Sequence, residues 1–166
     1  MSEQVISTAL LTIASVIAVA ALVHTVYPSI MSMSSSFLTA TSTVSDRIET
    51  DLKIIYVVNQ STNLTNVWVK NIGKNSIGYN SIEMSDVFFG PEGNFERIPY
   101  DNSIPLPNNR WNYTIENNND NNNKWDPLET LKITIRKDNI YATSPRDYYL
   151  KIVLYNGVWD DDHFSI

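Results

Sequence analysis

The residue types most suited to chemistry form one cluster near the C-terminus: Asp160, Asp161, Asp162 and His163. Carboxylates beside an imidazole are the ligand types of a metal site. The cluster lies in a run that alternates like a strand, however, and neighbouring side chains of a strand point to opposite faces. They therefore do not converge on one ion. A solvated acidic turn explains the cluster better than a calcium site, and we expect no metal site.

Few other residues could support catalysis. The chain has no cysteine, which excludes disulfides, thiolate ligands and a cysteine nucleophile. His24, the other histidine, lies in an apolar run, where a side chain at a membrane interface is a simpler interpretation than a ligand. No Gly-x-Ser-x-Gly, phosphate-binding loop or His-Glu-x-x-His motif occurs. We therefore predict no catalytic residue, no cofactor and no enzyme activity.

The aromatic and basic residues bear on two kinds of ligand. Four tryptophans and nine tyrosines could form a sugar-binding platform, but aromatic residues that alternate within strands more often belong to a core. The tryptophans are Trp68, Trp111, Trp125 and Trp159. The formal net charge is -6 and the basic residues are scattered, so the chain does not attract a phosphate backbone. We expect no nucleic-acid partner.

The charge distribution divides the chain into two parts. Glu3 is the only acidic or basic residue before Asp46. The segment 5–23 is apolar apart from Ser and Thr, and about 20 helical residues cross the ~30 Å hydrocarbon layer. No basic segment precedes it, so an uncleaved anchor fits better than a secretory signal or a buried core helix. We predict a cytoplasmic tail at 1–4, a membrane-spanning helix at 5–27, a stalk at 28–50 and a β-sandwich at 51–166.

The predicted stalk could be helical or extended. Pro28 should kink or end the membrane helix, and residues 29–45 are rich in Ser and Thr. Apolar residues then recur at helical spacing, which predicts a second helix that runs down to the sandwich. They are Val44, Ile48, Leu52 and Ile55. A weakly polar helix that leaves a membrane is also what a subunit uses to pack against copies of itself.

One side of the predicted membrane helix carries small residues. Ala14, Ala18, Ala21 and Thr25 fall within about 60° of one another at 100° per residue. A stripe of small side chains lets two helix backbones approach closely in lipid. Alanine is also common in apolar helices, and no GxxxG motif is present. We predict that the stripe is a helix-packing face in a homo-oligomer, with an unspecific apolar surface as the alternative.

After residue 50 the hydrophobic pattern changes to a period of two. Seven short runs rich in Val, Ile, Tyr, Trp and Thr alternate with turn residues, which is typical of strands. The runs are 52–58, 66–72, 86–90, 110–116, 131–137, 147–155 and 158–166. Asn156-Gly157 marks a hairpin, and the Asn-rich tract 116–124 an exposed loop. This pattern predicts an all-β, immunoglobulin-like sandwich, with no helix after residue 60.

Three sequons bear on the topology. Asn59, Asn63 and Asn112 each begin an Asn-x-Ser/Thr sequence, the acceptor of N-glycosylation. A tail as short as 1–4 is most easily left in the cytoplasm, which sends the sandwich outside. We therefore expect a single-pass protein of the cell membrane with an extracytoplasmic sandwich, and the three asparagines are candidate glycosylation sites.

Several segments together resemble a known family. They are 9–30, 44–57, 67–78 (VWVKNIGKNSIG), 86–100 (DVFFGPEGNFERIPY), 130–135 and 148–158. This combination resembles the accessory proteins of the archaeal flagellum, the archaellum, of the FlaG type and, less closely, of the FlaF type. The resemblance covers most of the chain, and 86–100 is its most specific part. It implies one membrane helix followed by an archaellin-like β-sandwich beneath the surface layer.

The resemblance implies a non-enzymatic, force-bearing role. Members of the family are stator components of the rotary motor; the F type binds the surface-layer protein, and the G type polymerises and is capped by the F type. We expect a membrane-anchored stator component that self-assembles, contacts a FlaF-type partner and through it the surface-layer protein, and couples the motor to the cell envelope. The alternative is a pilin-like filament subunit or an envelope adhesin. Glu3 mimics the acidic residue of such subunits, but their basic leader is missing, which favours the stator.

Overall fold

The chain divides into two compact units. A computed structural model describes residues 2–118, 121–138 and 147–165. The first unit is Met1–Val44 and the second is Ser45–Ile166. The division follows the charge pattern, because the charged residues other than Glu3 all lie in the second unit.

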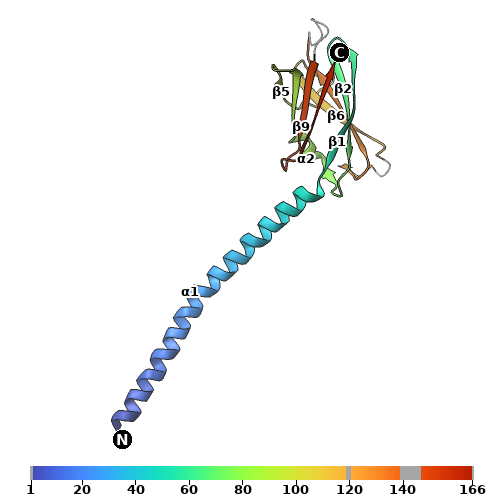
Figure 1. Ribbon diagram of the computed structural model, residues 1–166. Coiled ribbons are helices and arrows are strands. Elements are labelled where there is room, and N and C mark those ends of the chain that lie inside the picture. The colour runs from blue at the N-terminus through green and yellow to red at the C-terminus, as the bar shows by residue number, and fades with distance from the viewer. Residues whose placement is uncertain (1, 119–120, 139–146, 166) are drawn as a thin grey trace. The chain divides into compact units, whose positions relative to one another are not determined.

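One long helix, α1, spans Ser2–Glu49 (blue to cyan in Figure 1). Many of its Ser and Thr hydroxyls make hydrogen bonds within the helix. Thr12 and Ser15, for example, donate to backbone carbonyls one turn earlier at 2.8–2.9 Å. These residues therefore add little unsatisfied polarity to an apolar helix. No residue of α1 is buried, and the helix is long and apolar enough to cross a membrane.

The helix corrects two local predictions. It does not end at Pro28, because that residue lies inside α1, and Ser29 donates its hydroxyl to the carbonyl of Thr25 across the affected turn. The stalk is helical, as one of its two alternatives predicted, but Leu52 and Ile55 do not continue that helix, because α1 ends at Glu49 and both residues lie in the strand Leu52–Ser61, where Leu52 pairs with Asn71. Helical spacing coincides there with the alternation of a strand, and long-range pairing selects the strand.

The described residues of the second unit after α1 form ten strands and one short helix. They are β1 (Leu52–Ser61), β2 (Leu64–Asn71), β3 (Ile77–Gly78), α2 (Tyr79–Glu83), β4 (Asp86–Pro91), β5 (Glu96–Ile98), β6 (Arg110–Glu116), β7 (Lys124–Trp125), β8 (Thr130–Arg136), β9 (Asp147–Val153) and β10 (Trp159–Ser165). Each of the seven predicted strands is present. Three strands of two or three residues, β3, β5 and β7, are too short to show a period in the sequence.

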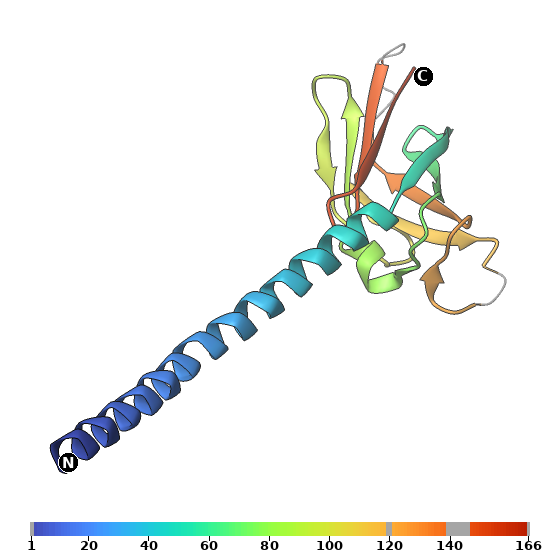
Figure 2. The same cartoon turned by 60° about the horizontal axis from the view of Figure 1, so that its bottom comes forward.

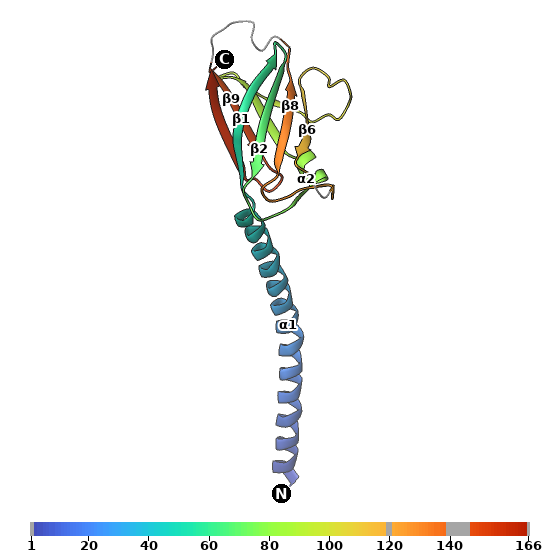
Figure 3. The same ribbon diagram turned by 90° about the vertical axis from the view of Figure 1, so that its right-hand side faces the viewer.

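The long strands form two four-stranded antiparallel sheets. One has the order β1-β2-β8-β6 and the other β10-β9-β4-β5 (Figure 3). Strands β3 and β7 form a separate pair. The prediction of an all-β sandwich after an N-terminal helix is confirmed. Parts of the Asn-rich tract, residues 119 and 120, lie outside the described residues.

Alternate residues of the strands fill the space between the sheets. Strand β8 buries Leu131, Ile133 and Ile135, and β9 buries Tyr148 and Leu150. Their neighbours along each strand are half-buried or exposed, which is the pattern of a sheet with one face on a core. Each fully buried side chain of this size contributes roughly 1.5–3 kcal/mol, so the sandwich needs no disulfide.

Helix α2 corrects the expectation of no helix after residue 60. It is the short green coil beside the strands in Figure 2 and has five residues. Ile82 points into the core with 1% of its surface exposed. One buried contact therefore holds a single turn that is too short to show helical periodicity.

A cluster of aromatic side chains closes the core beside α2. The ring of Tyr100 lies 5.0 Å from that of Trp111 and 5.8 Å from that of Tyr113. The Tyr100 hydroxyl donates to a Glu83 carboxylate oxygen at 3.1 Å. Burial, reinforced by this hydrogen bond, raises the pKa of Tyr100 to about 12, and burial also raises the pKa of Tyr113.

These shifts predict an alkaline limit to stability. Since the folded state holds Tyr100 neutral above the ordinary pKa of about 10, its contribution is complete below pH ~10 and declines as the pH rises towards ~12. We expect the urea midpoint of the 46–166 fragment to fall over this range. Tyr100→Phe should reduce the fall, whereas Tyr56→Phe, at a tyrosine that is 60% exposed, should leave it unchanged; equal slopes for all three proteins would contradict the assignment.

Candidate functional site

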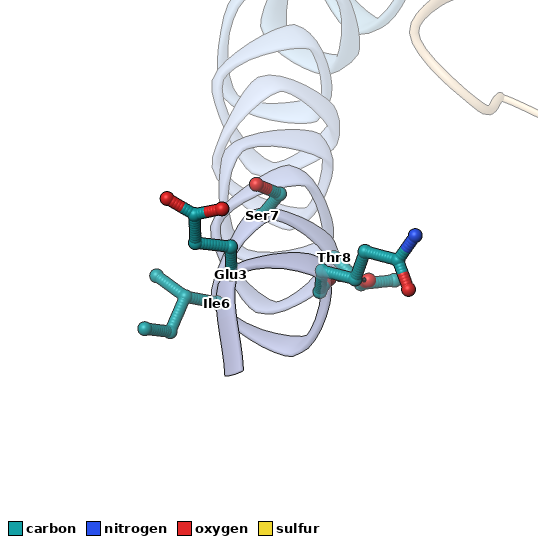
Figure 4. Close-up of a pocket in the computed structure, with 5 residues that line it drawn as sticks. Glu3, Ile6, Ser7 and Thr8 are labelled. Atoms are coloured by element: carbon teal, nitrogen blue, oxygen red, sulfur yellow. Dashed lines mark hydrogen bonds between the residues drawn. The ribbon is translucent and has the colours of Figure 1, made fainter. Parts of the chain in front are cut away.

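The described residues offer no enclosed site for catalysis. One surface depression of about 690 Å³ is lined by Glu3, Gln4, Ile6, Ser7 and Thr8. Figure 4 shows that the labelled side chains project outward from the first turns of α1. Groups that diverge from a single helix do not converge on a substrate, and a catalytic site requires such convergence.

The acidic cluster near the C-terminus serves the fold. Asp160 accepts hydrogen bonds from Lys53 Nζ at 2.9 Å and from the backbone N–H of Ile54 at 2.8 Å. It therefore ties β1 of one sheet to β10 of the other, and its carboxylate raises the pKa of Lys53. The predicted acidic turn is wrong, because the three aspartates lie within β10. Among residues 2–118, 121–138 and 147–165, no group of three His, Cys, Asp or Glu could hold a metal.

The tryptophans divide between core and surface. Trp111 and Trp125 are buried, as the core interpretation predicts. Trp68 is half-buried and packs against Tyr56 with ring centroids 5.8 Å apart, and its indole N–H donates to Glu116. Trp159 is 52% exposed beneath Lys151 Nζ, which lies 3.8 Å from the ring centroid. The two surface tryptophans lie on different sheets, so they do not form one sugar-binding platform.

Asp46 is the centre of the best-defined polar network. Its carboxylate accepts hydrogen bonds from the hydroxyl of Tyr155 at 3.0 Å and from the amides of Asn75 and Asn156 at 3.1 Å each. The Asn156 amide also donates to Thr50 Oγ1 at 2.9 Å. All of these residues belong to the second unit. These hydrogen bonds join the final helical turn to the loops that follow β2 and β9.

The backbone at the end of the helix packs directly against Gly73. A Cβ atom at Gly73 would lie 2.5 Å from the backbone nitrogen of Asp51 and 2.6 Å from the carbonyl oxygen of Glu49. Asn71, fully buried, donates to the carbonyls of Asn75 and Trp125 and accepts from the Gly73 N–H. Asn71 and Gly73, within the segment 67–78, therefore mark the place where the loop after β2 packs against the end of the helix.

The predicted glycosylation and packing residues are accessible to different degrees. Asn59 is exposed on β1, whereas Asn63 and Asn112 are half-buried. Ala14, Ala18, Ala21 and Thr25 are exposed on α1, and Thr25 also donates to the carbonyl of Ala21. His24 is exposed on the same helix. None of these residues belongs to the buried core of the sandwich.

Two comparisons decide the family. The profile of the family described as archaeal-type flagellin matches residues 2–164. An uncharacterized protein of Archaeoglobus fulgidus is 33% identical over 168 residues, which are 99% of each chain. The chain belongs to the archaeal-type flagellin family.

Solved structures allow a narrower comparison of this chain. It is similar to the archaellum periplasmic stator protein FlaG of Sulfolobus acidocaldarius, at 30% identity and a TM-score of 0.56, over 69% of this chain and 99% of that one. It is also similar to a chain of the FlaF and FlaG stator complex of that organism, at 29% identity and a TM-score of 0.55, over 68% and 87%. The resemblance to FlaG-type archaellum proteins is confirmed, and the chain is archaellum stator-like.

A third structure extends the likeness to the helix. The archaeal flagellum of Methanospirillum hungatei strain JF1 matches 97% of this chain and 92% of its own, with a TM-score of 0.68 and 12% identity. At that identity the likeness shows the fold alone. The proteins of the matched family and of the two FlaG structures are structural components of the archaellum.

Sequence reasoning missed the Asp46 network. The partners of Asp46 lie 29, 109 and 110 positions away, and no local motif joins them. The available signal was the turn residues Asn75 and Asn156 beside Gly73 and Gly157. Such residues suggest loops that pack closely against other backbone, but they do not identify Asp46 as the carboxylate that accepts hydrogen bonds from these loops.

Removing the Asp46 carboxylate should loosen the end of the helix. We expect Asp46→Ala to lower the free energy of unfolding of the 45–166 unit by about 1–3 kcal/mol, because three donors lose their acceptor. Asp51→Ala, at an exposed carboxylate five positions later, is the control and should change stability little. Urea denaturation measures both; equal losses would show that Asp46 acts only through general surface charge.

Proposed function

We propose that the chain is a membrane-anchored stator subunit of the archaellum, which self-assembles and couples the rotary motor to the cell envelope. The observation that carries the proposal is 30% identity to a FlaG stator protein over 99% of that protein's solved chain. A helix suited to crossing a membrane precedes the sandwich. A stationary part that resists torque needs an anchor and a stable load-bearing domain, and the two units supply these.

The proposed topology follows the charge pattern. Residues 1–4 form a cytoplasmic tail, 5–27 the membrane-spanning helix, 28–50 the stalk and 51–166 the sandwich on the extracytoplasmic side, beneath the surface layer. The FlaG relative is a periplasmic stator protein, which supports this side of the membrane. On this side the sequons at Asn59, Asn63 and Asn112 would be accessible to glycosylation, and exposed Asn59 is the most accessible acceptor.

The proposed partners are a second copy of the chain, a FlaF-type subunit and, through that subunit, the surface-layer protein. A FlaG relative occurs in a solved complex with FlaF, which supports a heterotypic contact here. The alternative function is a pilin-like filament subunit, and the likeness to an archaeal flagellum over 97% of the chain favours it at the level of the fold. The stronger sequence identity lies with the stator proteins.

Deletion and complementation test the function. We expect deletion of the gene to abolish swimming while the external filaments still form, and the full-length chain to restore swimming. The 46–166 fragment should be soluble and should not restore it, whereas the full-length protein should stay with membranes through a high-salt wash, because its attachment is hydrophobic. Loss of the filaments themselves would instead support the filament subunit, and unimpaired swimming would exclude a stator role.

The small-residue stripe yields a second test. We propose that Ala14, Ala18, Ala21 and Thr25 allow close packing of helices within the membrane. Ala18→Leu should then reduce the crosslinked oligomer of the full-length protein and reduce swimming, because the added side chain separates the backbones. Val16→Leu, on another side of the helix, is the control and should have little effect. Equal effects from both substitutions, or none from either, would place self-association elsewhere.

A further inference from the structure

The part of α1 beyond the proposed membrane segment carries an apolar stripe with a seven-residue period. Ile30, Phe37 and Val44 are seven positions apart, and Met33 and Ala40 lie three positions after the first two. At 100° per residue these five positions fall within about 80° of one another. Positions a and d of a coiled coil have this spacing. The five residues are called the seam here.

The far side of the same segment is rich in hydroxyl side chains. Within an arc of about 120° at 100° per residue it carries Ser32, Ser35, Ser36, Thr39, Ser42 and Thr43. Met31 and Leu38 lie about 140° and 120° from Val44, the middle of the seam, and are therefore also on the far side. Hydroxyl residues are more frequent here than in the segment 5–23, which carries Ser7, Thr8, Thr12 and Ser15. No hydroxyl side chain lies within the arc of the seam itself, so this side suits an apolar contact with a protein partner.

The seam is uncovered within the chain. Ile30, Met33, Phe37 and Val44 are between 55% and 78% exposed. Ser and Thr dominate the rest of the segment, and these residues have modest helix propensity. A helix of this composition is marginal in water without tertiary contacts. The observed helix therefore implies a partner for the seam.

Lipid does not cover the seam. The stretch without acidic or basic residues, 4–45, is about 60 Å long as a helix, twice the ~30 Å hydrocarbon layer. About half of it must lie outside the bilayer. A helix lying flat on the membrane is also disfavoured, because such helices carry Lys and Arg on their polar face, and residues 29–44 have none.

A second copy of the chain fits the seam best. Single-span anchors that enter the membrane at the same residue hold their helices parallel and at the same height, so each seam residue meets its own counterpart. Parallel coiled coils pack in this register, with the residues of positions a and d facing their counterparts. No charged residue flanks the seam within 29–44 to select a different partner through opposite charge.

We propose that Ile30, Met33, Phe37, Ala40 and Val44 pack against the same residues of a second copy, as a short parallel coiled coil just outside the membrane. The proposal rests on the proposed membrane anchor and deepens the proposed self-assembly. The seam lies about 110° round the helix from the stripe of Ala14, Ala18, Ala21 and Thr25. The two faces therefore contact different neighbours or act independently.

Cysteine crosslinking tests the seam directly, because the chain contains no cysteine of its own. Three matched pairs of single-cysteine variants of the full-length protein compare the two sides at equal height: Ile30→Cys with Ser32→Cys, Phe37→Cys with Thr39→Cys, and Val44→Cys with Ser42→Cys. In membranes treated with a mild oxidant, we expect at least about tenfold more disulfide-linked homodimer from the seam member of each pair. Equal yields within the pairs, or higher yields from the hydroxyl side, would overturn the proposal.

Charged substitutions supply a second measurement. Phe37→Glu should reduce the Ile30→Cys homodimer at least about tenfold, because identical parallel helices bring two carboxylates together, whereas Thr39→Glu should leave it unchanged. A seam cysteine that links to a different protein in place of its own copy would overturn the choice of partner. If deletion abolishes swimming but crosslinking shows no preference for the seam, the seam proposal is wrong and the proposed stator function stands. If crosslinking prefers the seam but cells swim without the protein, the seam proposal stands and the proposed stator function is wrong.

Discussion

The second unit depends on a close backbone approach at Gly73. The carbonyl of Glu49 and the N–H of Asp51 lie where any Cβ at position 73 would stand. The same carbonyl accepts the N–H of Lys74 at 2.7 Å, and the Asp51 carbonyl accepts the N–H groups of Ile72 and Gly73. The chain must change from helix to strand within a few residues there. These bonds satisfy the helix end, so that β1 begins at Leu52 in register with β2.

Several ionisable side chains around this frame form pairs between strands. Asp160 pairs with Lys53, Asp86 with Arg97, and Glu96 with Lys137. Most of these pairs are solvent-exposed and contribute little individually. The arrangement suits a domain that resists deformation, which agrees with the structural role of its archaellum relatives.

The long regular elements could be predicted from the sequence, and the local connections could not. The helix and seven strands follow from hydrophobic periods that tertiary contacts reinforce, as in the buried alternation of Leu131, Ile133 and Ile135. Helix α2 and strand β5 are shorter than one clear period, so their patterns carry too little information. The Asp46 network depends on residues more than 100 positions apart, and only the folded topology brings them together. The predicted stalk ends at residue 50 and α1 ends at Glu49, although the spacing of Leu52 and Ile55 by itself fits both a helix and a strand.

The two halves of α1 bear on the choice between a stator and a filament. A filament subunit that leaves the membrane must transfer its entire apolar helix from lipid into contacts with other subunits, so that packing residues are needed along its full length. In this chain the segment 29–44 carries the seam and many hydroxyl residues, whereas the segment 5–23 is apolar apart from Ser7, Thr8, Thr12 and Ser15. Under the proposed topology, copies associate through the seam outside the bilayer while the first segment stays in lipid, at no cost in membrane extraction. Self-assembly and permanent anchoring are then compatible in one helix, and a stationary element of a rotary motor requires both.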